Sequence, residues 1–207
     1  VGNEPIRILA SGKVNVAFVE KVARLDFEGY TNDSHNPLTE LVRQIASEYH
    51  PSFILLDVRS GLHDLGGLSL NVLSHLNVLF NRDSEQAWAG LETVLTILGD
   101  HRHAGHNSEV LVVHSFVPSA DRDRTAHQRF LDRSFKAFEN SGYFAVAETM
   151  PDIASPDAPY GLPIPFQESL QNVSSAATLK PNTDSDGAYV VLAKRIGSFL
   201  GRHTLPT

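Results

Sequence analysis

The sequence predicts an α/β fold in three layers, with a mainly parallel sheet and helices on both of its faces. Two observations lead to this fold class. Short apolar runs without polar alternation recur along the chain, as in strands that are buried on both faces of a parallel sheet. Between them lie longer segments with apolar residues at helical spacing, so strands and helices alternate. For 207 residues we expect one domain spanning residues 1–207.

The composition argues against several functional classes for this protein. The 42% of hydrophobic residues supports a packed core, and no apolar run reaches the roughly 18 residues of a membrane span. The net charge of −7 argues against a broad nucleic-acid surface. Because the chain holds no cysteine, it can form neither a disulfide framework nor a thiolate metal site, and we expect a cytoplasmic protein.

The stretch 53–67 carries the strongest functional signal. Its apolar run 53–56 predicts a buried strand, and Asp57 would then lie at the carboxyl end of that strand. Open α/β sheets bind their ligands at this end of the strands. Gly61 and the glycine pair at 66–67 allow the following loop to approach a ligand closely. This layout suits phosphate and metal chemistry.

Capping residues and apolar spacing predict the other elements. Pro37 suits the first position of a helix that Pro51 ends. Asp83 and Gln86 form a capping box for a second helix, which we expect to end at Gly99. The remaining predicted elements are strands at 6–10, 77–81, 110–113 and 144–147, short helices within 14–30, helices at 68–76, 124–140 and 188–199, a loop at 114–118 and an irregular proline-rich segment at 150–165.

Each candidate residue also has a simpler interpretation. Asp57 is either a partner of magnesium or of a catalytic water, or a carboxylate that forms a turn. Arg59 either contacts an anion or is a solvated cation of the loop. His101, His103 and His106 either bind zinc or nickel or belong to a solvated loop, since no fourth ligand is evident. His114 is either a base or a hydrogen-bonded structural residue.

No common catalytic motif occurs in the sequence. A nucleotide site normally needs a G-x-x-x-x-G-K-[ST] loop that cradles the phosphates. The Gly12-Lys13 dipeptide has Arg7 in place of the first glycine and Val14 in place of the hydroxyl residue. It is therefore either a decayed cradle or an ordinary turn. Nucleophile elbow, H-E-x-x-H and G-x-G-x-x-G motifs are also missing, which weakens hydrolase and dinucleotide hypotheses.

The order of several segments resembles the ParA/MinD-type P-loop ATPases, in particular their KGGVGK branch. The segments are Ile8-Leu-Ala-Ser-Gly-Lys13, Ala23-Arg-Leu-Asp-Phe27 and Asp57-Val-Arg-Ser-Gly-Leu-His-Asp-Leu-Gly66, with weaker similarity at 83–90, 110–118, 162–170 and 188–193. The resemblance spans nearly the whole chain. It implies a P-loop NTPase-like fold that binds ATP and Mg²⁺.

The resemblance also implies roles for individual residues. Asp57 matches the Walker B aspartate, which helps to hold magnesium through water, and 59–61 matches the switch segment that senses the γ-phosphate. Ser115 to Pro118, and Pro165 with Phe166, match loops that flank the base. The implied residues are Asp57 and Arg59 as catalytic, Asp57 at the metal, and Ser60, Gly61, Ser115, Phe116, Pro118, Pro165 and Phe166 at the nucleotide. Ser60 stands where other members have threonine.

The absent phosphate loop leaves two interpretations. We expect the chain to be the C-terminal part of an ATPase whose first strand and phosphate loop lie upstream, so that the fold is incomplete at its N-terminus. The parent protein would be a nucleotide-dependent switch, coupled to a protein partner or a fused effector domain, and able to form a homodimer. The alternative is a catalytically inactive interaction or regulatory module with the same fold. A metal-dependent enzyme that uses the histidine cluster is a third hypothesis.

Overall fold

The computed structural model describes residues 6–9, 37–58, 73–106, 108–117, 124–166 and 183–202. The chain divides into two compact units, Val1–Leu56 and Asp57–Thr207. The predicted short helices within 14–30, and residues 68–72 of the helix predicted at 68–76, lie outside the described residues. The predicted end of that helix is wrong, because residues 74–75 are not helical and Leu76 begins a strand. The expectation of a single domain remains a prediction.

In the first unit the described helix is α3, Pro37–Tyr49, which confirms the predicted helix. Arg43 pairs with Glu40 one turn earlier, at 2.5 Å. His50 ends the helix in the left-handed region, with φ +43°, and its N–H donates to the carbonyl of Ala46 at 3.1 Å. The guanidinium of Arg7 lies 4.8 Å from the centre of the Tyr49 ring.

Two strands predicted in the first part of the chain are wrong. Residues 6–9 and 51–58 are irregular in the structure, and neither segment pairs with a described strand. Leu55 is 85% exposed and Ile8 86% exposed, so these apolar runs are not buried. An apolar run does not make a strand by itself, because a strand needs a neighbour for its backbone hydrogen bonds. The predicted strand end at Asp57 is therefore not formed.

The second unit contains a parallel sheet of three described strands in the order β1-β2-β3. They are β1, Leu76–Asn81, β2, Glu109–Val117, and β3, Leu162–Pro165. The first two confirm predicted strands, although β2 continues through most of the predicted loop at 114–118. The described part of the chain is thus mixed α/β.

The third strand corrects two predictions. No strand forms at 144–147, whereas β3 lies in the proline-rich segment that we expected to be irregular. Pro163 and Pro165 belong to β3, which is at the edge of the described sheet. An edge strand tolerates proline because some of its N–H groups have no partner strand to meet.

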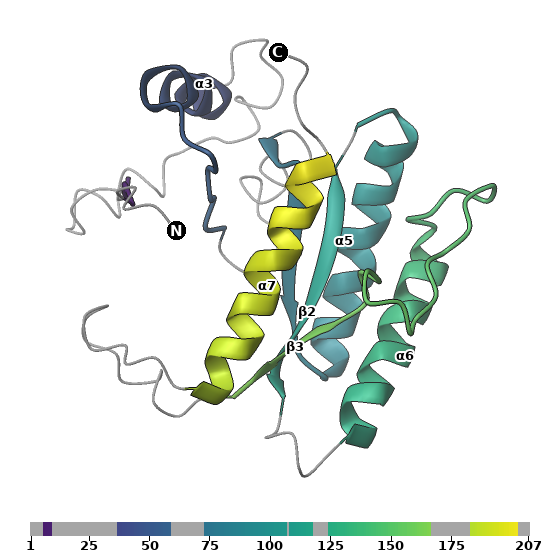
Figure 1. Cartoon of the computed structure of the whole chain (residues 1–207). Helices are drawn as coiled ribbons and strands as arrows, with labels where there is room; N and C mark the ends of the chain where they lie inside the picture. The colour runs from purple at the N-terminus through teal and green to yellow at the C-terminus, as the bar shows by residue number, and fades with distance from the viewer. Residues whose placement is uncertain are drawn as a thin grey trace, which may run out of the picture. The chain divides into compact units, whose positions relative to one another are not determined.

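Helices cover both faces of this sheet (Figure 1). On one face lie α5, Glu85–His103, and α6, Arg124–Ser141, and on the other lies α7, Thr183–Arg202. Successive residues of β2 serve the two faces in turn. Val110 and Val112 pack with the α5 and α6 core, and Leu111 and Val113 pack with the α7 core. The full P-loop NTPase fold remains a prediction.

The helix α5 differs from its prediction at both ends. Ser84, and not Asp83, is the N-cap, because the Ser84 hydroxyl accepts from the backbone N–H of Ala87 at 3.3 Å. The helix continues past Gly99 to His103. Gly99 serves close packing instead, since a Cβ there would lie 2.9 Å from the Cα of Tyr143.

The other two helices are tied to their surroundings in different ways. The helix α6 confirms the prediction at 124–140, and Gly142 follows it with φ +66°. The helix α7 is longer than the predicted 188–199, and Arg195 joins it to the proline-rich segment through the carboxylate of Asp157 at 2.6 Å and the carbonyl of Ala158 at 2.7 Å. Of the described helices, none combines the length and apolar character that crossing a membrane requires.

Candidate functional site

Four residues that the sequence predicts to contact a nucleotide come together where β2 and β3 end. Ser115 is in register with Ile164, and Val117 with Pro165. The backbone N–H of Phe166 donates to the carbonyl of Val117 at 3.0 Å, which extends the pairing by one residue. Ser115, Phe116, Pro165 and Phe166 therefore lie together at one edge of the sheet, the one formed by the carboxyl ends of its strands. Parallel sheets bind their ligands at this edge.

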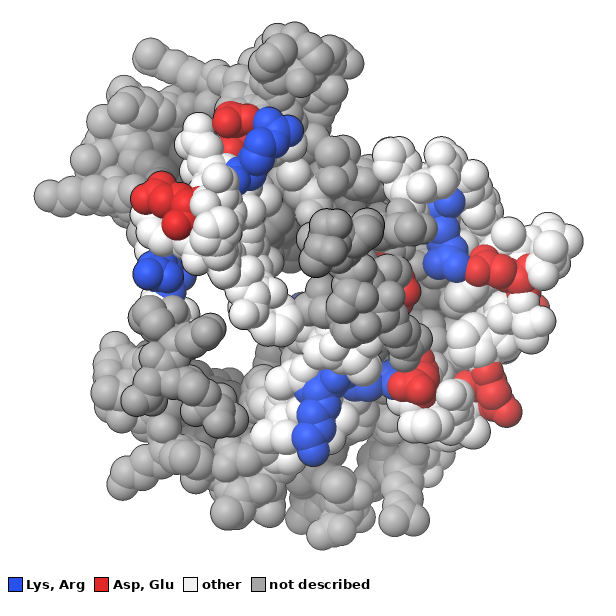
Figure 2. Space-filling model, turned by 45° about the horizontal axis from the view of Figure 1, so that its top comes forward, with Lys and Arg blue, Asp and Glu red and all other residues white. Residues whose placement is uncertain are grey.

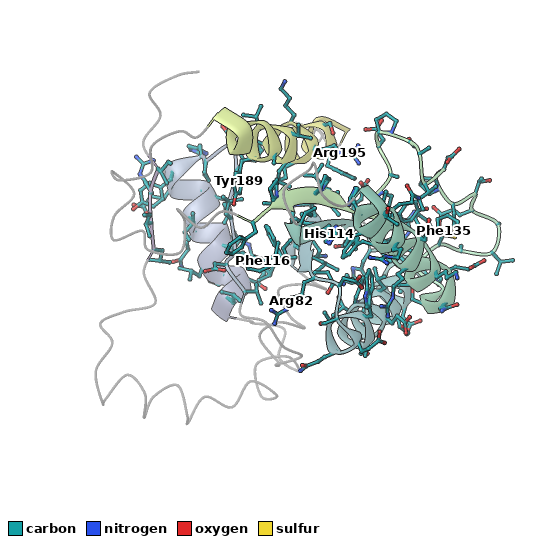
Figure 3. All side chains as sticks on the ribbon, turned by 90° about the horizontal axis from the view of Figure 1, so that it is seen from below. Arg82, His114, Phe116, Phe135, Tyr189 and Arg195 are labelled. Carbon is teal, nitrogen blue, oxygen red and sulfur yellow. The ribbon has the colours of Figure 1, made fainter. Side chains whose placement is uncertain are left out.

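Two exposed aromatic rings mark this edge. The rings of Phe116 and Phe166 have their centroids 5.8 Å apart at an interplanar angle of 39°. Phe116 is 60% exposed and Phe166 is 44% exposed. Figure 3 is seen from the side on which β2 ends, and it labels Phe116 there with Arg82, which follows β1. An exposed aromatic pair can take a planar ligand by stacking.

The backbone of Phe116 is strained. Its φ of +60° lies in the left-handed region, which costs a residue other than glycine about 1–2 kcal/mol. The strand register shifts between Ser115 and Val117 at the same place. The Ser115 hydroxyl donates to the carbonyl of Asn81 at 2.9 Å and ties this irregular strand end to β1. Irregularities of this kind re-aim side chains and are frequent beside functional sites.

Asn81 places a buried amide at the end of β1. Its side chain is 7% exposed, and its Nδ2 has no hydrogen-bond partner among the described residues. Leaving such a donor unpaired costs about 1–3 kcal/mol. An acceptor supplied by a ligand would remove that cost. No feature of the sequence marked Asn81 in advance, because its burial depends on the neighbouring strand.

A pair of imidazoles, of which His114 is buried and His127 is half-buried, lies just inside this edge. The Nδ1 atoms of His114 and His127 are 3.0 Å apart, and their rings are stacked with an angle of 11°. His114 also stacks on Phe130, at a centroid distance of 3.8 Å. Burial lowers the pKa of His114 to about 4, helped by the charge of His127 and opposed by Asp83, and burial also lowers the pKa of His127. Both imidazoles are therefore neutral at pH 7.

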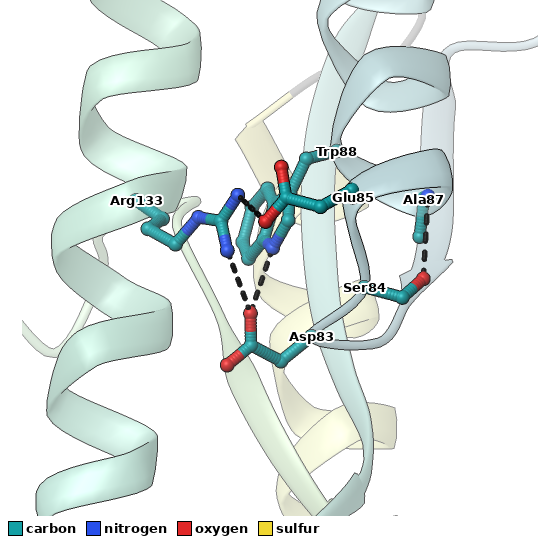
Figure 4. Close-up of polar contacts among 6 residues, drawn as sticks. All are labelled: Asp83, Ser84, Glu85, Ala87, Trp88 and Arg133. Carbon is teal, nitrogen blue, oxygen red and sulfur yellow. Dashed lines mark hydrogen bonds and ion pairs between the residues drawn. The ribbon is translucent and has the colours of Figure 1, made fainter.

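The start of α5 is fixed to α6 by a polar network (Figure 4). Asp83 accepts from the indole nitrogen of Trp88 at 2.8 Å and from Arg133 at 3.2 Å. The same guanidinium donates to Glu85 at 2.9 Å and lies 4.9 Å from the centre of the Trp88 ring. The network holds the beginning of α5, which directly follows the end of β1, in place. Sequence reasoning missed it because Arg133 carries no local signal that points to Asp83.

Arg59, Ser60, Gly61 and Pro118 lie outside the described residues. Asp57 is described and exposed, in an irregular stretch. Their roles remain predictions.

The histidine cluster lies at the other end of β2. The rings of His101 and His106 have centroids 5.6 Å apart. His103 and His106 line a hollow of about 350 Å³, together with Arg102, Ser108, Glu109, Ala145 and Glu148. Within the described ranges, no group of three or more metal-binding side chains is arranged to hold a metal ion. The zinc hypothesis thus gains no support from these histidines.

Charges on the described surface are mixed in sign. On the face drawn in Figure 2, the described basic side chains lie beside acidic ones, with no basic patch. The ion pairs of Arg102 with Glu148 and of Arg133 with Glu85 are two examples.

The chain matches no protein-family model, no curated protein and no solved structure. The aromatic pair at the carboxyl ends of the strands remains the strongest candidate site.

Proposed function

We propose that this chain is a nucleotide-binding domain of the ParA/MinD type, and that the edge formed by Phe116 and Phe166 holds the adenine of ATP. The observation that carries the proposal is the contact of these two exposed rings, 5.8 Å apart, where parallel strands end. The adenine ring stacks on the aromatic pair, which contributes about 1–3 kcal/mol. Asn81 and Arg82 supply a donor and a charge nearby.

The proposal assigns the metal and the phosphates to other residues than the aromatic pair. In a parent ATPase that supplies the phosphate loop, Asp57 holds Mg²⁺ through water, and Arg59, Ser60 and Gly61 sense the γ-phosphate, as the family resemblance implies. Ser115, Pro118 and Pro165 flank the base. The sequence contains no G-x-x-x-x-G-K-[ST] loop, so nothing in this chain neutralises the triphosphate in the usual way. The 207 residues by themselves therefore bind the base and hydrolyse ATP very slowly.

The second candidate is an inactive interaction module with the same fold. The exposed ring of Phe80 favours it, because this side chain of β1 is 62% exposed. Exposed aromatic side chains are common at sites where proteins meet. In this alternative the edge binds a protein partner or a second copy of the chain, and not a nucleotide.

A titration of the 207-residue chain separates these functions. Adenosine, ATP with Mg²⁺ and inorganic triphosphate are added in turn, and backbone NMR shifts are followed. We expect adenosine and ATP to bind with similar millimolar affinity, near −4 kcal/mol, and triphosphate not to bind. Phe116→Ala should weaken adenosine binding at least fivefold, since one stacking partner is lost.

Tyr49→Ala is the matched control, because Tyr49 is also an aromatic residue and is 44% exposed, but belongs to α3. It should leave adenosine binding unchanged. Absence of adenosine binding in the original chain would rule out the nucleotide proposal. Equal weakening by Tyr49→Ala and Phe116→Ala would show that the binding is not specific to this edge.

A further inference from the structure

The hydrogen bond between His114 and His127 requires a single proton between the two facing Nδ1 atoms. Two ring nitrogens that face each other at 3.0 Å form a bond only if one donates and the other accepts. With both imidazoles neutral, opposite tautomers satisfy this condition. If one ring gains a second proton, that ring donates and the neutral ring accepts. If both rings are protonated, two donors face each other and the hydrogen bond is lost.

The pair joins two elements on one side of the sheet. His114 is near the end of β2, and His127 belongs to the first turn of α6. Phe130, one turn further along α6, stacks on His114 with an angle of 10° between the rings. The end of β2 is thus held against α6 by one hydrogen bond and two ring contacts.

The backbone conformation of Phe116 depends on these contacts between β2 and α6. It lies two residues beyond His114 and keeps a left-handed φ of +60°, which persists only where neighbouring contacts enforce it. The hydrogen bond from Ser115 to Asn81 and the pairing of Phe166 with Val117 hold this backbone toward β1 and β3, and the contacts of His114 hold it toward α6. If the β2 end moved away from α6, the strained residue would be free to relax, and its ring would leave the position beside Phe166.

We propose that His114 and His127 form a proton-sensitive fastening, which holds the β2 end and the Phe116 ring while at least one imidazole is neutral and releases them when acid protonates both. The inference goes beyond the proposed function and does not rest on nucleotide binding. It assigns His127 as a positioning residue, because His127 acts on Phe116 only through His114.

The charged groups around the two histidines determine how the pair responds to a change in pH. The connection between β1 and α5 brings Asp83 toward His114, and Asp83 is itself paired with Arg133 of α6, which also pairs with Glu85 of α5. Phe130 faces the pair with an apolar ring. Burial lowers both pKa values, more than Asp83 restores for His114, so the fastening is closed at neutral pH and opens toward pH 4.

The test follows the imidazoles and Trp88 in the ligand-free chain between pH 7.5 and pH 4. Nitrogen-15 NMR should find His114 and His127 neutral and in opposite tautomers at pH 6, and a single transition below pH 5. Trp88 reports the same transition by fluorescence, because its ring packs on Phe130 with centroids 4.7 Å apart. The Phe116 ring protons should shift together with Trp88.

Two variants separate the fastening from general acid unfolding. His127→Gln keeps a hydrogen-bonding side chain but cannot be protonated, so the transition should disappear or move by more than one pH unit. His103→Gln, at an exposed histidine, should keep it unchanged. Circular dichroism at pH 7 checks that both variants fold, and His114→Asn replaces His127→Gln if that variant does not.

Two results would overturn the proposal. One is titration of His114 and His127 near the ordinary histidine value of 6.5. The other is an unchanged Trp88 transition in His127→Gln. Both are measured without ligand, so failure of adenosine binding would count against the proposed function and leave the fastening standing.

Discussion

The indole nitrogen of Trp88 donates a hydrogen bond to the carboxylate of Asp83 at 2.8 Å, across the N-terminal boundary of α5. The same carboxylate oxygen accepts from Arg133 of α6 at 3.2 Å. One carboxylate therefore fixes the start of α5, the buried indole and the neighbouring helix (Figure 4). This arrangement holds the beginning of α5 against α6.

Asp83→Asn should destabilise the second unit by about 1–2 kcal/mol, because hydrogen bonds to a charged group are stronger than neutral ones. Urea unfolding monitored by Trp88 fluorescence measures the change. Asp132→Asn is the control, since Asp132 makes an exposed hydrogen bond to Gln128 on the same helix. It should change the unfolding free energy by less than about 0.5 kcal/mol. Equal effects of the two changes would contradict the structural role of Asp83.

Gly99→Ala should destabilise the protein by about 1–3 kcal/mol, although alanine is the better helix former. The added Cβ would lie 2.9 Å from the Cα of Tyr143 and 3.3 Å from the carbonyl of Gly142, and backbone atoms cannot easily give way. Gly90→Ala, in the same helix with nothing within 4 Å of its Cβ, should instead stabilise by about 0.5–1 kcal/mol. Thermal and urea unfolding of the two variants should move in opposite directions.

Phe116→Gly and Phe116→Ala remove the same ring but differ in the backbone. Glycine adopts a φ of +60° without strain, whereas alanine keeps the strain. The glycine variant should therefore be more stable than the alanine variant by about 1 kcal/mol, and both should bind adenosine more weakly than the original chain. Chemical unfolding gives the difference directly. If the alanine variant were the more stable of the two, Phe116 would not be in the left-handed conformation.

The unfolding free energy should fall as the pH is lowered from 6.5 to about 4. The folded-state pKa of His114 is about 4 and its ordinary value is 6.5, so the unfolded state binds more protons throughout this window. Stability is complete above pH 6.5, and the loss for His114 is on the order of 2 kcal/mol. The lowered pKa of His127 acts in the same direction. His114→Gln should flatten the stability profile, whereas His103→Gln should leave its slope unchanged.

The elements that the sequence predicts correctly carry their signals locally. The helices α3 and α6 show apolar spacing, and β1 and β2 contain short apolar runs at 78–80 and 110–113. The strand β3 was missed because its formation depends on pairing with β2, which lies far away in the sequence. The run at 53–56 was predicted to be a strand for the opposite reason, since its apolar residues resemble a buried strand without having a described partner.

The candidate site was predictable in part. Phe116 and Phe166 were expected at the nucleotide from the family resemblance, and the structure brings their rings together. The unpaired amide of Asn81 and the hydrogen bond between His114 and His127 were not predicted. Both depend on tertiary contacts, which place two elements side by side without leaving a local pattern.

The most direct test of the proposed function is a nuclear Overhauser measurement between adenosine and the aromatic protons of the 207-residue chain. The proposal predicts contacts from the adenine protons H2 and H8 to the rings of Phe116 and Phe166, and none to Tyr49. Contacts to Tyr49 as strong as those to Phe116, or no contact to either phenylalanine at saturating adenosine, would contradict it.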